Sequence, residues 1–459
     1  MTTSPASASP TGPIVPFGQP MRQAHFRFSP TYTPINHGSY GTHPASVSAA
    51  HAALQAEAEA APDKFIVLDW APRLRESRAA TAGLLNCETD DVVFVPNATT
   101  GIDTVLKNLR WAPGDVVLAY EVVYDSVRAG LAWLEETSPG RVRVEVVPLR
   151  FPVSDANLVD AMVAAARRVN ASGTGERVRL AIVDTVVSMP GLRIPFEALV
   201  PALRAEGALV LVDAAHGIGH VELDLAALDP DFLVTNLHKW LFVPRGAAAL
   251  YVPRRNQGLV RTSLPTSFRF RKRGGDEATV TTTNGGNAFV ELFDFTATLD
   301  MTNFLTVKDA LAFRTQVCGG EAAIQKYCRT VAREGGEAAA AVLGTEVLGA
   351  ATAGSCMLEC SFANVRLPLE ISSGSVSSSG ELAGGKEGKI DPATTPKLAA
   401  WFKETGVAEA GYYFQTCLHA GALWWRLSGM VYLDVEDFRR GAVVLLGLCE
   451  RARKGEYLL

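Results

Sequence analysis

The chain has 459 residues, of which 48% are hydrophobic and 20% charged, so it can bury a large core and is expected to form two domains. A net charge of -5, with no basic stretch interleaved with aromatic residues, argues against a nucleic-acid partner. Seven cysteines without a CxxC spacing argue against a disulfide framework and a zinc site, so no metal is expected.

The first residues carry no export or membrane signal. Residues 1–13 are rich in Ser, Thr and Pro and lack an apolar core, which argues against a secretory signal and a membrane span. The first arginine is Arg22, whereas a mitochondrial transit peptide is rich in early arginines. We therefore expect a disordered tail over residues 1–20, a cytoplasmic protein and no membrane partner.

Residues 21–90 are expected to form an N-terminal segment that joins a smaller domain. Within it, residues 35–44 (Ile-Asn-His-Gly-Ser-Tyr-Gly-Thr-His-Pro) predict a glycine-punctuated loop, and the alanine-rich residues 45–60 predict a helix. Loops of this kind often face a site. Asn36 and His37 are therefore candidates for substrate binding.

Apolar strand patterns alternate with helical patterns from Asp91 onward. The strand candidates are residues 92–95, 116–120, 142–148, 179–184, 208–213, 232–235 and 247–252. They predict an α/β fold, with a seven-stranded, mainly parallel sheet that carries helices on both faces, in a large domain over residues 91–307. Ligands of such sheets bind at the carboxyl ends of the strands.

A smaller and less regular α+β domain is expected over residues 308–459, with a closing helix at 435–454. Residues 371–389 consist mostly of Ser, Gly, Glu and Lys and contain almost no apolar side chains. Such a composition cannot bury enough surface to order itself, so it predicts an exposed and mobile insertion.

Polar groups follow the strands of the predicted sheet. Ala98 and Thr99 open a helix, where free N–H groups and a hydroxyl suit a phosphate, although a simple N-cap explains the same residues. Tyr124, after the second strand, is either a ring that covers a flat cofactor or a packed aromatic. Asp184 ends the fourth strand, where it either faces the site or caps a turn.

Asp213 and Lys239 are the two residues on which the prediction of a cofactor site mainly depends. Asp213 ends a buried strand, where a carboxylate needs a cationic partner such as a protonated pyridine nitrogen. Lys239 lies among apolar residues, which lower the pKa of its amine and suit it for a covalent bond with an aldehyde cofactor. A structural salt bridge and a snorkelling surface lysine are the alternatives. His216 follows Asp213 in the same turn, and His238 is a candidate donor to a phosphate.

Arg426 lies in an aromatic, strand-like run, Trp424-Trp425-Arg426-Leu427-Ser428. A planar guanidinium there suits bidentate binding of an amino-acid carboxylate. A structural or cation–π arginine explains the local sequence equally well.

Four motifs occur in a fixed order: Asn-Ala-Thr at 97–99, Asp-Ala-Ala-His at 213–216, His-Lys-Trp followed by Pro-Arg-Gly at 238–246, and Arg-Leu-Ser at 426–428. In this order they resemble the class V aminotransferase family, enzymes of fold type I that depend on pyridoxal 5'-phosphate (PLP). Residues 36–39, 188–191, 264–267 and 287–290 are similar to its isopenicillin N epimerase-like branch. That branch includes fungal carbon–sulfur lyases that cleave hercynylcysteine sulfoxide.

The resemblance implies roles for the cofactor-binding candidates. It makes Lys239 the residue that binds PLP covalently, Asp213 the partner of the pyridine nitrogen, and Tyr124 a stacking residue that can also act as an acid. It places His216 near the phenolic oxygen of the ring. The residues implied to hold the phosphate are Ala98, Thr99 and His238.

The resemblance also bears on substrate and assembly. It implies that Arg426 binds the carboxylate of an amino-acid substrate, and that the chain forms a homodimer to which Asn284 to Asn287 contribute across the interface. Residues 371–389 contain no cysteine, which argues against a cysteine desulfurase. Val67 stands where related lyases tend to have an arginine, so substrate recognition is expected to differ.

We therefore expect a PLP-dependent lyase that cleaves the carbon–sulfur bond of a cysteine conjugate or its sulfoxide by β-elimination. Lys239 would remove the α-proton and Tyr124 would protonate the leaving group. An epimerase, an aminotransferase, or an elimination or cyclisation enzyme of fungal secondary metabolism would use the same motifs. A catalytically silent binding protein with this fold is the alternative from another class.

Overall fold

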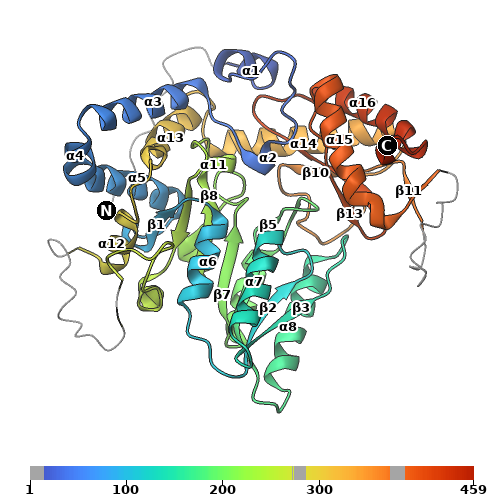
Figure 1. Cartoon of the computed structure of the whole chain (residues 1–459). Helices are drawn as coiled ribbons and strands as arrows, with labels where there is room; N and C mark the ends of the chain where they lie inside the picture. The colour runs from blue at the N-terminus through green and yellow to red at the C-terminus, as the bar shows by residue number, and fades with distance from the viewer. Residues whose placement is uncertain (1–14, 271, 273–285, 373–387) are drawn as a thin grey trace.

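The computed structural model describes residues 15–270, 272, 286–372 and 388–459 (Figure 1). Its centre is a seven-stranded sheet in the order β1-β9-β8-β7-β4-β2-β3. The strands are β1 (Val92–Val95), β2 (Asp115–Tyr120), β3 (Val142–Val147), β4 (Arg177–Asp184), β7 (Leu209–Ala214), β8 (Phe232–Asn236) and β9 (Ala248–Tyr251). Neighbours from β3 to β8 are parallel, and β9 is antiparallel to both β8 and β1. This sheet confirms the predicted α/β fold.

Side-chain alternation along the strands builds one core on each face of the sheet. In β7, Val210 and Val212 belong to one core and Leu211 to the other. Apolar residues of α8 (Asp155–Asn170) and α9 (Phe196–Ala205) join the first core, and those of α6 (Ala98–Asn108) and α7 (Asp125–Thr137) join the second. Because both faces are covered, polar side chains can leave the sheet only at the strand ends.

The C-terminal part is built on a second, antiparallel sheet in the order β10-β14-β13. Its strands are β10 (Phe362–Arg366), β13 (Gln415–His419) and β14 (Ala422–Ser428), and its main helices are α14 (Glu321–Leu343), α15 (Thr395–Ala410) and α16 (Val435–Arg453). β14 is the central strand and almost entirely buried. A polar side chain on β14 therefore needs partners from other elements.

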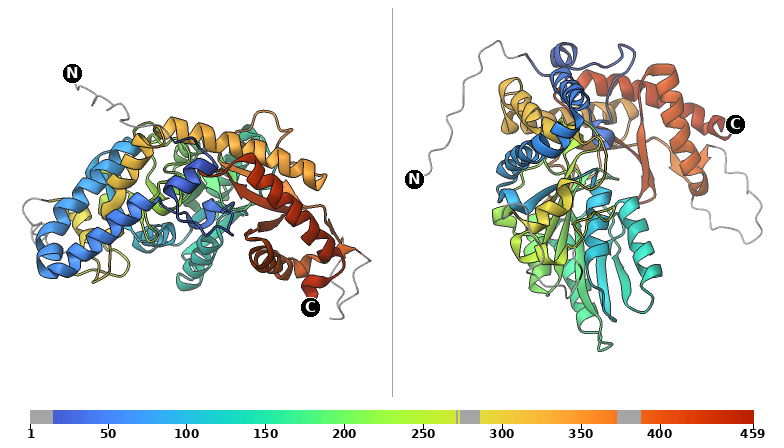
Figure 2. Two further views of the ribbon diagram at one scale, coloured as in Figure 1. Left: turned by 90° about the horizontal axis from the view of Figure 1, so that it is seen from above. Right: turned by 60° about the vertical axis from the view of Figure 1, so that its left-hand side comes forward.

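The N-terminal residues contact both parts of the molecule. Ile35 O accepts a hydrogen bond from Ser428 N–H, which ties the loop before α2 (His37–Tyr40) to β14. Further along, α3 (Ala45–Ala60), α5 (Trp70–Leu85) and α13 (Val307–Gln316) pack together. Figures 1 and 2 show α3 and α5 on one side above the sheet, with α15 and α16 on the other.

The remaining short elements connect these parts. They are α1 (Gln19–His25), α4 (Pro62–Lys64), a π-helical turn (Phe65–Asp69), β5 (Val186–Val187), β6 (Leu192–Arg193), α10 (Leu225–Leu228), α11 (Leu237–Trp240), α12 (Ala288–Asp294), β11 (Glu370–Ile371) and β12 (Lys389–Ile390). None of the helices in the described ranges is both long and apolar enough to cross a membrane.

Three expected segments differ from, or fall outside, the described structure. The predicted tail over 1–20 is too long, because Gln19 begins α1; residues 1–14 lie outside the described residues. The predicted insertion over 371–389 is also too long, because Ile371 and Lys389 belong to the paired strands β11 and β12; residues 373–387 lie outside the described residues. Of the stretch from Asn284 to Asn287, Asn284 lies outside them, whereas Asn287 caps α12.

Candidate active site

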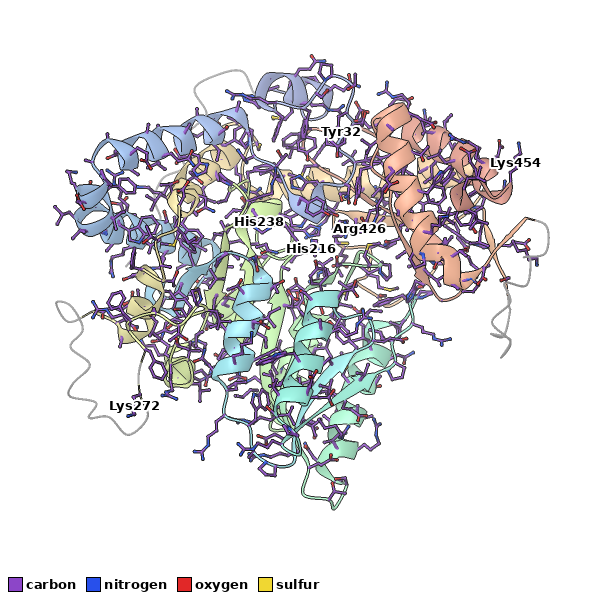
Figure 3. The ribbon with its side chains drawn as sticks, in the orientation of Figure 1. Tyr32, His216, His238, Lys272, Arg426 and Lys454 are labelled. Atoms are coloured by element: carbon purple, nitrogen blue, oxygen red, sulfur yellow. The ribbon has the colours of Figure 1, made fainter. Side chains whose placement is uncertain are left out.

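Two connected cavities lie at the carboxyl ends of β2, β4, β7 and β8. The inner cavity has a volume of about 170 Å³ and the outer one about 670 Å³, and Ser39, Tyr124, Ser188 and Lys239 line both. The predicted cofactor-binding residues all line the inner cavity: Ala98, Thr99, Tyr124, Asp184, Asp213, His216, His238 and Lys239. Arg426 lines the outer cavity. Figure 3 shows His216, His238 and Arg426 gathered above the sheet.

Lys239 lies on α11, directly after β8, and is half-buried. Its Nζ lies 3.1 Å from Nε2 of His216. Burial lowers the pKa of Lys239 to about 8, although the carboxylate of Asp213 acts in the opposite direction. A substantial fraction of the amine is therefore neutral near pH 8, as a nucleophile must be.

Asp184 and Asp213 are buried neighbours, because their residues pair across β4 and β7. Burial raises the pKa of both carboxyl groups, and repulsion from Asp213 raises the pKa of Asp184 further. The Tyr120 hydroxyl donates to Asp184 Oδ2 at 2.6 Å, and Ala215 N–H donates to Asp213 Oδ1 at 2.9 Å. Among the described residues, no side chain donates a hydrogen bond to Asp213. A cationic N–H donor from a ligand would meet this need.

The start of α6 forms the opposite end of the inner cavity. Asn97 is its N-cap and accepts a hydrogen bond from Thr100 N–H at 2.9 Å, and Ala98 N–H donates to Asn236 Oδ1 at 2.9 Å. Ala98 lines the cavity as predicted, but its amide is already bonded to Asn236, so its contact with a phosphate stays a prediction. Thr99 N–H has no partner in the described part of the chain, and its hydroxyl lies 2.9 Å from that of Ser126.

His238 lines the cavity at the same end. Its Nδ1–H donates to the Ala247 carbonyl at 2.8 Å, so Nε2 is the nitrogen left for a ligand. Burial lowers the pKa of His238 to about 4 in the absence of an anion. A phosphate dianion beside Nε2 would raise that pKa, and with Thr99 and the helix N-terminus it would complete an anion site.

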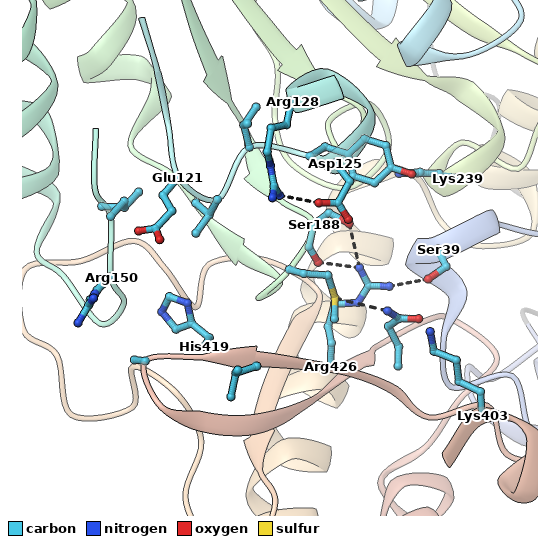
Figure 4. Close-up of a pocket in the computed structure, with 18 of the residues that line it drawn as sticks. Ser39, Glu121, Asp125, Arg128, Arg150, Ser188, Lys239, Lys403, His419 and Arg426 are labelled. Atoms are coloured by element: carbon cyan, nitrogen blue, oxygen red, sulfur yellow. Dashed lines mark hydrogen bonds and ion pairs between the residues drawn. The ribbon is translucent and has the colours of Figure 1, made fainter. Parts of the chain in front are cut away.

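Arg426 projects from β14 beneath the outer cavity and is buried (Figure 4). Its Nη1–H donates to Ser188 O at 2.7 Å, and its Nη2 donates to Asn36 Oδ1 at 2.9 Å and to Ser39 Oγ at 2.7 Å. The guanidinium also lies over the Phe362 ring, with 4.6 Å from Cζ to the centroid. The cation–π alternative therefore describes a real contact that holds Arg426 in place.

The same guanidinium has unused binding capacity. Its buried Nε–H has no partner among the described residues. No carboxylate forms an ion pair with Arg426 in the described part of the chain, and burial lowers its pKa to about 10. A carboxylate bound there would satisfy the free donor and the charge, which fits the predicted contact with an amino acid.

Asn36 and His37 do not line either of the two cavities that contain Lys239. Asn36 instead accepts from Arg426, and His37 Nδ1 lies 2.6 Å from the Tyr432 hydroxyl in a buried position. Their predicted direct contact with a substrate stays a prediction, because their side chains are bonded to other residues and line neither cavity. They lie one layer below the cavity, where they support Arg426 and Trp240.

Several lining residues were absent from the prediction. Ser39 and Tyr40 lie within the predicted glycine-punctuated loop, three residues after Asn36 and His37, and that loop is the signal for them. Asn236 ends β8 directly before the lysine turn, so its position at a strand end could have identified it. His419 and Lys403 come from the C-terminal part, and no local signal marks them as cavity residues.

The family profile described as aminotransferase class-V matches residues 68–317. The chain belongs to the class V aminotransferase family. This assignment confirms the family indicated by the ordered sequence motifs.

Curated relatives extend the likeness over almost the whole chain. The L-cysteine desulfhydrase-like protein lolT1 of Epichloe uncinata is 38% identical over 452 residues, which cover 95% of this chain and 96% of the relative. The hercynylcysteine sulfoxide lyase of Schizosaccharomyces pombe is 29% identical over 94% of this chain and 98% of the relative. The isopenicillin N epimerase of Amycolatopsis lactamdurans is 28% identical over 62% of this chain and 70% of the relative.

Solved structures share the fold. The cystine C-S lyase C-DES, in a complex with cysteine persulfide, superposes with a TM-score of 0.68 at 19% identity, covering 91% of this chain and 97% of that one. C-DES with glycine linked to its PLP cofactor gives a TM-score of 0.64 at 16% identity, over 91% of this chain and 96% of that one.

PLP is the cofactor of this family member, and the inner cavity fits it. Lys239 would supply an amine for the aldehyde, Asp213 would supply an acceptor for the pyridine nitrogen, and Thr99 with His238 would hold the phosphate. When bound, PLP withdraws electrons from the α-carbon of an amino acid. Asp213 is buried and accepts from the Ala215 N–H but from no side chain of the described residues, and a protonated pyridine nitrogen would give it such a donor.

Proposed function

We propose that this enzyme is a carbon–sulfur lyase that acts by β-elimination on a cysteine conjugate or its sulfoxide. The observation that carries the proposal is the outer cavity of about 670 Å³, which Lys239 and Arg426 line together. Pockets of about 300–1,000 Å³ hold drug-sized ligands, so this cavity has room for a substituent larger than the side chain of free cysteine.

The residues of the chain divide the reaction among them. Arg426 binds the substrate carboxylate, which directs the α-carbon toward Lys239. The neutral amine of Lys239 takes the α-proton, and the electron pair of the broken Cβ–S bond leaves with sulfur. Tyr124, which lines both cavities and is 47% exposed, is the candidate acid that protonates the departing group. The remaining three-carbon fragment hydrolyses to pyruvate and ammonia.

Charged side chains in the outer cavity favour a polar leaving group. Glu121, Arg150 and His419 lie across the cavity from Arg426 (Figure 4). Neither Glu121 nor Arg150 forms an ion pair with another side chain of the described residues. They can therefore contact polar groups of a substituent on sulfur without first breaking a contact within the protein.

A substrate panel tests the proposal. The purified holoenzyme is incubated with cysteine, an S-alkyl cysteine and its sulfoxide, and products are identified by mass spectrometry. We expect pyruvate, ammonia and the sulfur fragment, with faster turnover of the larger conjugates and no turnover by Lys239→Ala. If sulfur is retained while the α-hydrogen exchanges with deuterium, the lyase proposal fails, and inversion of configuration at the α-carbon identifies an epimerase. An amino transfer or a ring-closed product identifies the other reactions, and no reaction with any amino acid indicates a binding protein.

We also propose a cytoplasmic homodimer. Val67 is 73% exposed, Leu68 66% and Leu299 57%, and Leu299 with Ile66 lines an apolar cavity of about 450 Å³. A monomer rarely exposes so much clustered apolar surface, and a second copy would cover it. Light scattering on the purified protein tests the assembly: a monomeric mass at micromolar concentration contradicts it. Cell fractionation tests the location.

A further inference from the structure

Trp240 follows Lys239 in the chain, is buried, and contacts the rings of His37, His216, His220 and Phe362. It is 1% exposed, stacks on the His220 ring at 4.0 Å between centroids, and meets the Phe362 ring edge-on at 5.3 Å. Its only polar atom, the indole N–H, donates to Nδ1 of His216 at 3.1 Å. His216 is itself 2% exposed.

This hydrogen bond determines where His216 carries its proton. An indole N–H can only donate, so Nδ1 of His216 must accept and cannot be protonated. The neutral ring then has its proton on Nε2. Burial and the nearby positive charge of Lys239 lower the pKa of His216 well below its usual value, which keeps the ring neutral.

A second histidine holds the arrangement in place. His220 Nδ1–H donates to the His216 carbonyl at 2.8 Å, and His220 Nε2 accepts from Ser361 N–H at 2.7 Å. Both nitrogens of His220 are therefore used, and its ring forms a fixed surface against which Trp240 stacks. Trp240 cannot turn its N–H away from His216 without losing that contact.

The tautomer of His216 determines which group faces the amine of Lys239. Nε2–H of His216 lies 3.1 Å from Nζ of Lys239 and needs an acceptor. A neutral amine, or an oxygen of the bound cofactor, can accept; an ammonium group has no lone pair and would oppose N–H with N–H.

We propose that Trp240 is a positioning residue that, by fixing the tautomer of His216, holds an N–H donor against Lys239 and the cofactor atoms bound there. The inference rests on PLP as the cofactor and does not depend on the proposed carbon–sulfur substrate.

Other charges also act on Lys239, and the test must separate them from this one. Asp213 on β7 and Asp184 at the end of β4 favour the ammonium form, and Arg426 on β14 disfavours it. None of these three side chains hydrogen-bonds to Trp240. Removing the indole N–H therefore changes the effect of His216 on the pKa of Lys239, while the three charged side chains stay in place.

The direct experiment reads the tautomer by ¹⁵N NMR of histidine-labelled protein without cofactor. His216 is assigned by its loss in His216→Gln. We expect Nε2–H in the wild type. In Trp240→Phe the ratio of tautomers should shift by about fivefold toward Nδ1–H, the factor that corresponds to a net hydrogen bond of ~1 kcal/mol. A wild-type protein with the proton on Nδ1, or an unchanged ratio in the variant, overturns the proposal.

A second readout follows cofactor capture by the apoprotein as a function of pH. Its midpoint reports the pKa of Lys239, which should rise by about 0.7 pH unit in Trp240→Phe, the same fivefold factor. Trp111→Phe is the matched control, because it also removes a buried indole N–H, which donates to the Leu106 carbonyl at 3.0 Å. Trp111 lines neither cavity. An equal shift in both variants contradicts the proposal.

Trp240→Phe leaves a cavity and can fail to fold. Benzothienylalanine at position 240 keeps the bicyclic ring and lacks only the N–H. It should fold and reproduce the tautomer shift. If it folds and His216 keeps Nε2–H, the indole hydrogen bond does not set the tautomer.

Discussion

Replacement of Arg426 by lysine tests how the substrate carboxylate is bound. Arg426 donates hydrogen bonds to three residues, Ser188, Asn36 and Ser39, which hold its guanidinium in one orientation. A lysine ammonium is a point charge that cannot form a planar fork, so it keeps the positive charge but loses the second contact with a carboxylate. A charge-assisted hydrogen bond contributes roughly 1.5–3 kcal/mol, which predicts a fall in kcat/KM of about 10- to 150-fold for Arg426→Lys.

The assay compares two ligands in the wild-type enzyme and in Arg426→Lys. One is the conjugate found active in the substrate panel, and the other is its decarboxylated amine, for which Lys239-dependent binding is followed by cofactor absorbance. The substitution should weaken binding of the amino acid and leave binding of the decarboxylated analogue almost unchanged, because the lost contact is to the carboxylate.

Arg193→Lys is the control. Arg193 also lies over an aromatic ring, that of Phe196 at 5.2 Å, but it lines neither of the two cavities. Thermal unfolding of both variants separates a folding defect from a binding defect. An equal loss of affinity for the two ligands, or an unchanged KM for the amino acid, would refute the carboxylate contact.

Three more results are expected. Lys239→Ala should bind PLP without the absorbance band of the covalent linkage and lose turnover; a persisting band contradicts the assignment. Asp213→Asn should move the pH midpoint of cofactor capture below about 8, because the carboxylate raises the pKa of Lys239 and an amide does not. Gly41→Ala should lower the free energy of unfolding by at least ~1–3 kcal/mol in denaturant titration, because φ at Gly41 is +65° and a Cβ would lie 1.8 Å from the His238 carbonyl oxygen. Gly447→Ala is the control: it lies at an open helical position, so the substitution should be neutral or stabilising.

Local patterns were sufficient for most of the sheet and for the chemistry at its edge. Buried parallel strands are continuous apolar runs, and their ends are where polar residues appear, so Asp184 and Asp213 were identifiable one strand at a time. Lys239 was identifiable because a lysine among apolar residues is costly unless it has a function.

Residue type did not reveal which partner each side chain would meet. Asn36 and His37 belong to a predicted loop, but in the structure they form the start of α2 and their side chains turn toward Arg426 and Tyr432. Ala98 lies in the predicted anion site, but its amide is bonded to Asn236. In each case the competing partner lies more than a hundred positions away in the chain.

The sequence by itself determined the family and the cofactor and predicted Lys239 as the lysine that binds it, because these depend on residue types at strand ends in a fixed order. Only the tertiary structure decided that Trp240 fixes the tautomer of His216 and that His419, on the edge of the second sheet, reaches the cavity over the first. The physical reason is that hydrogen-bond partners and cavity walls are set by packing between distant segments, which leaves no periodic signal along the chain.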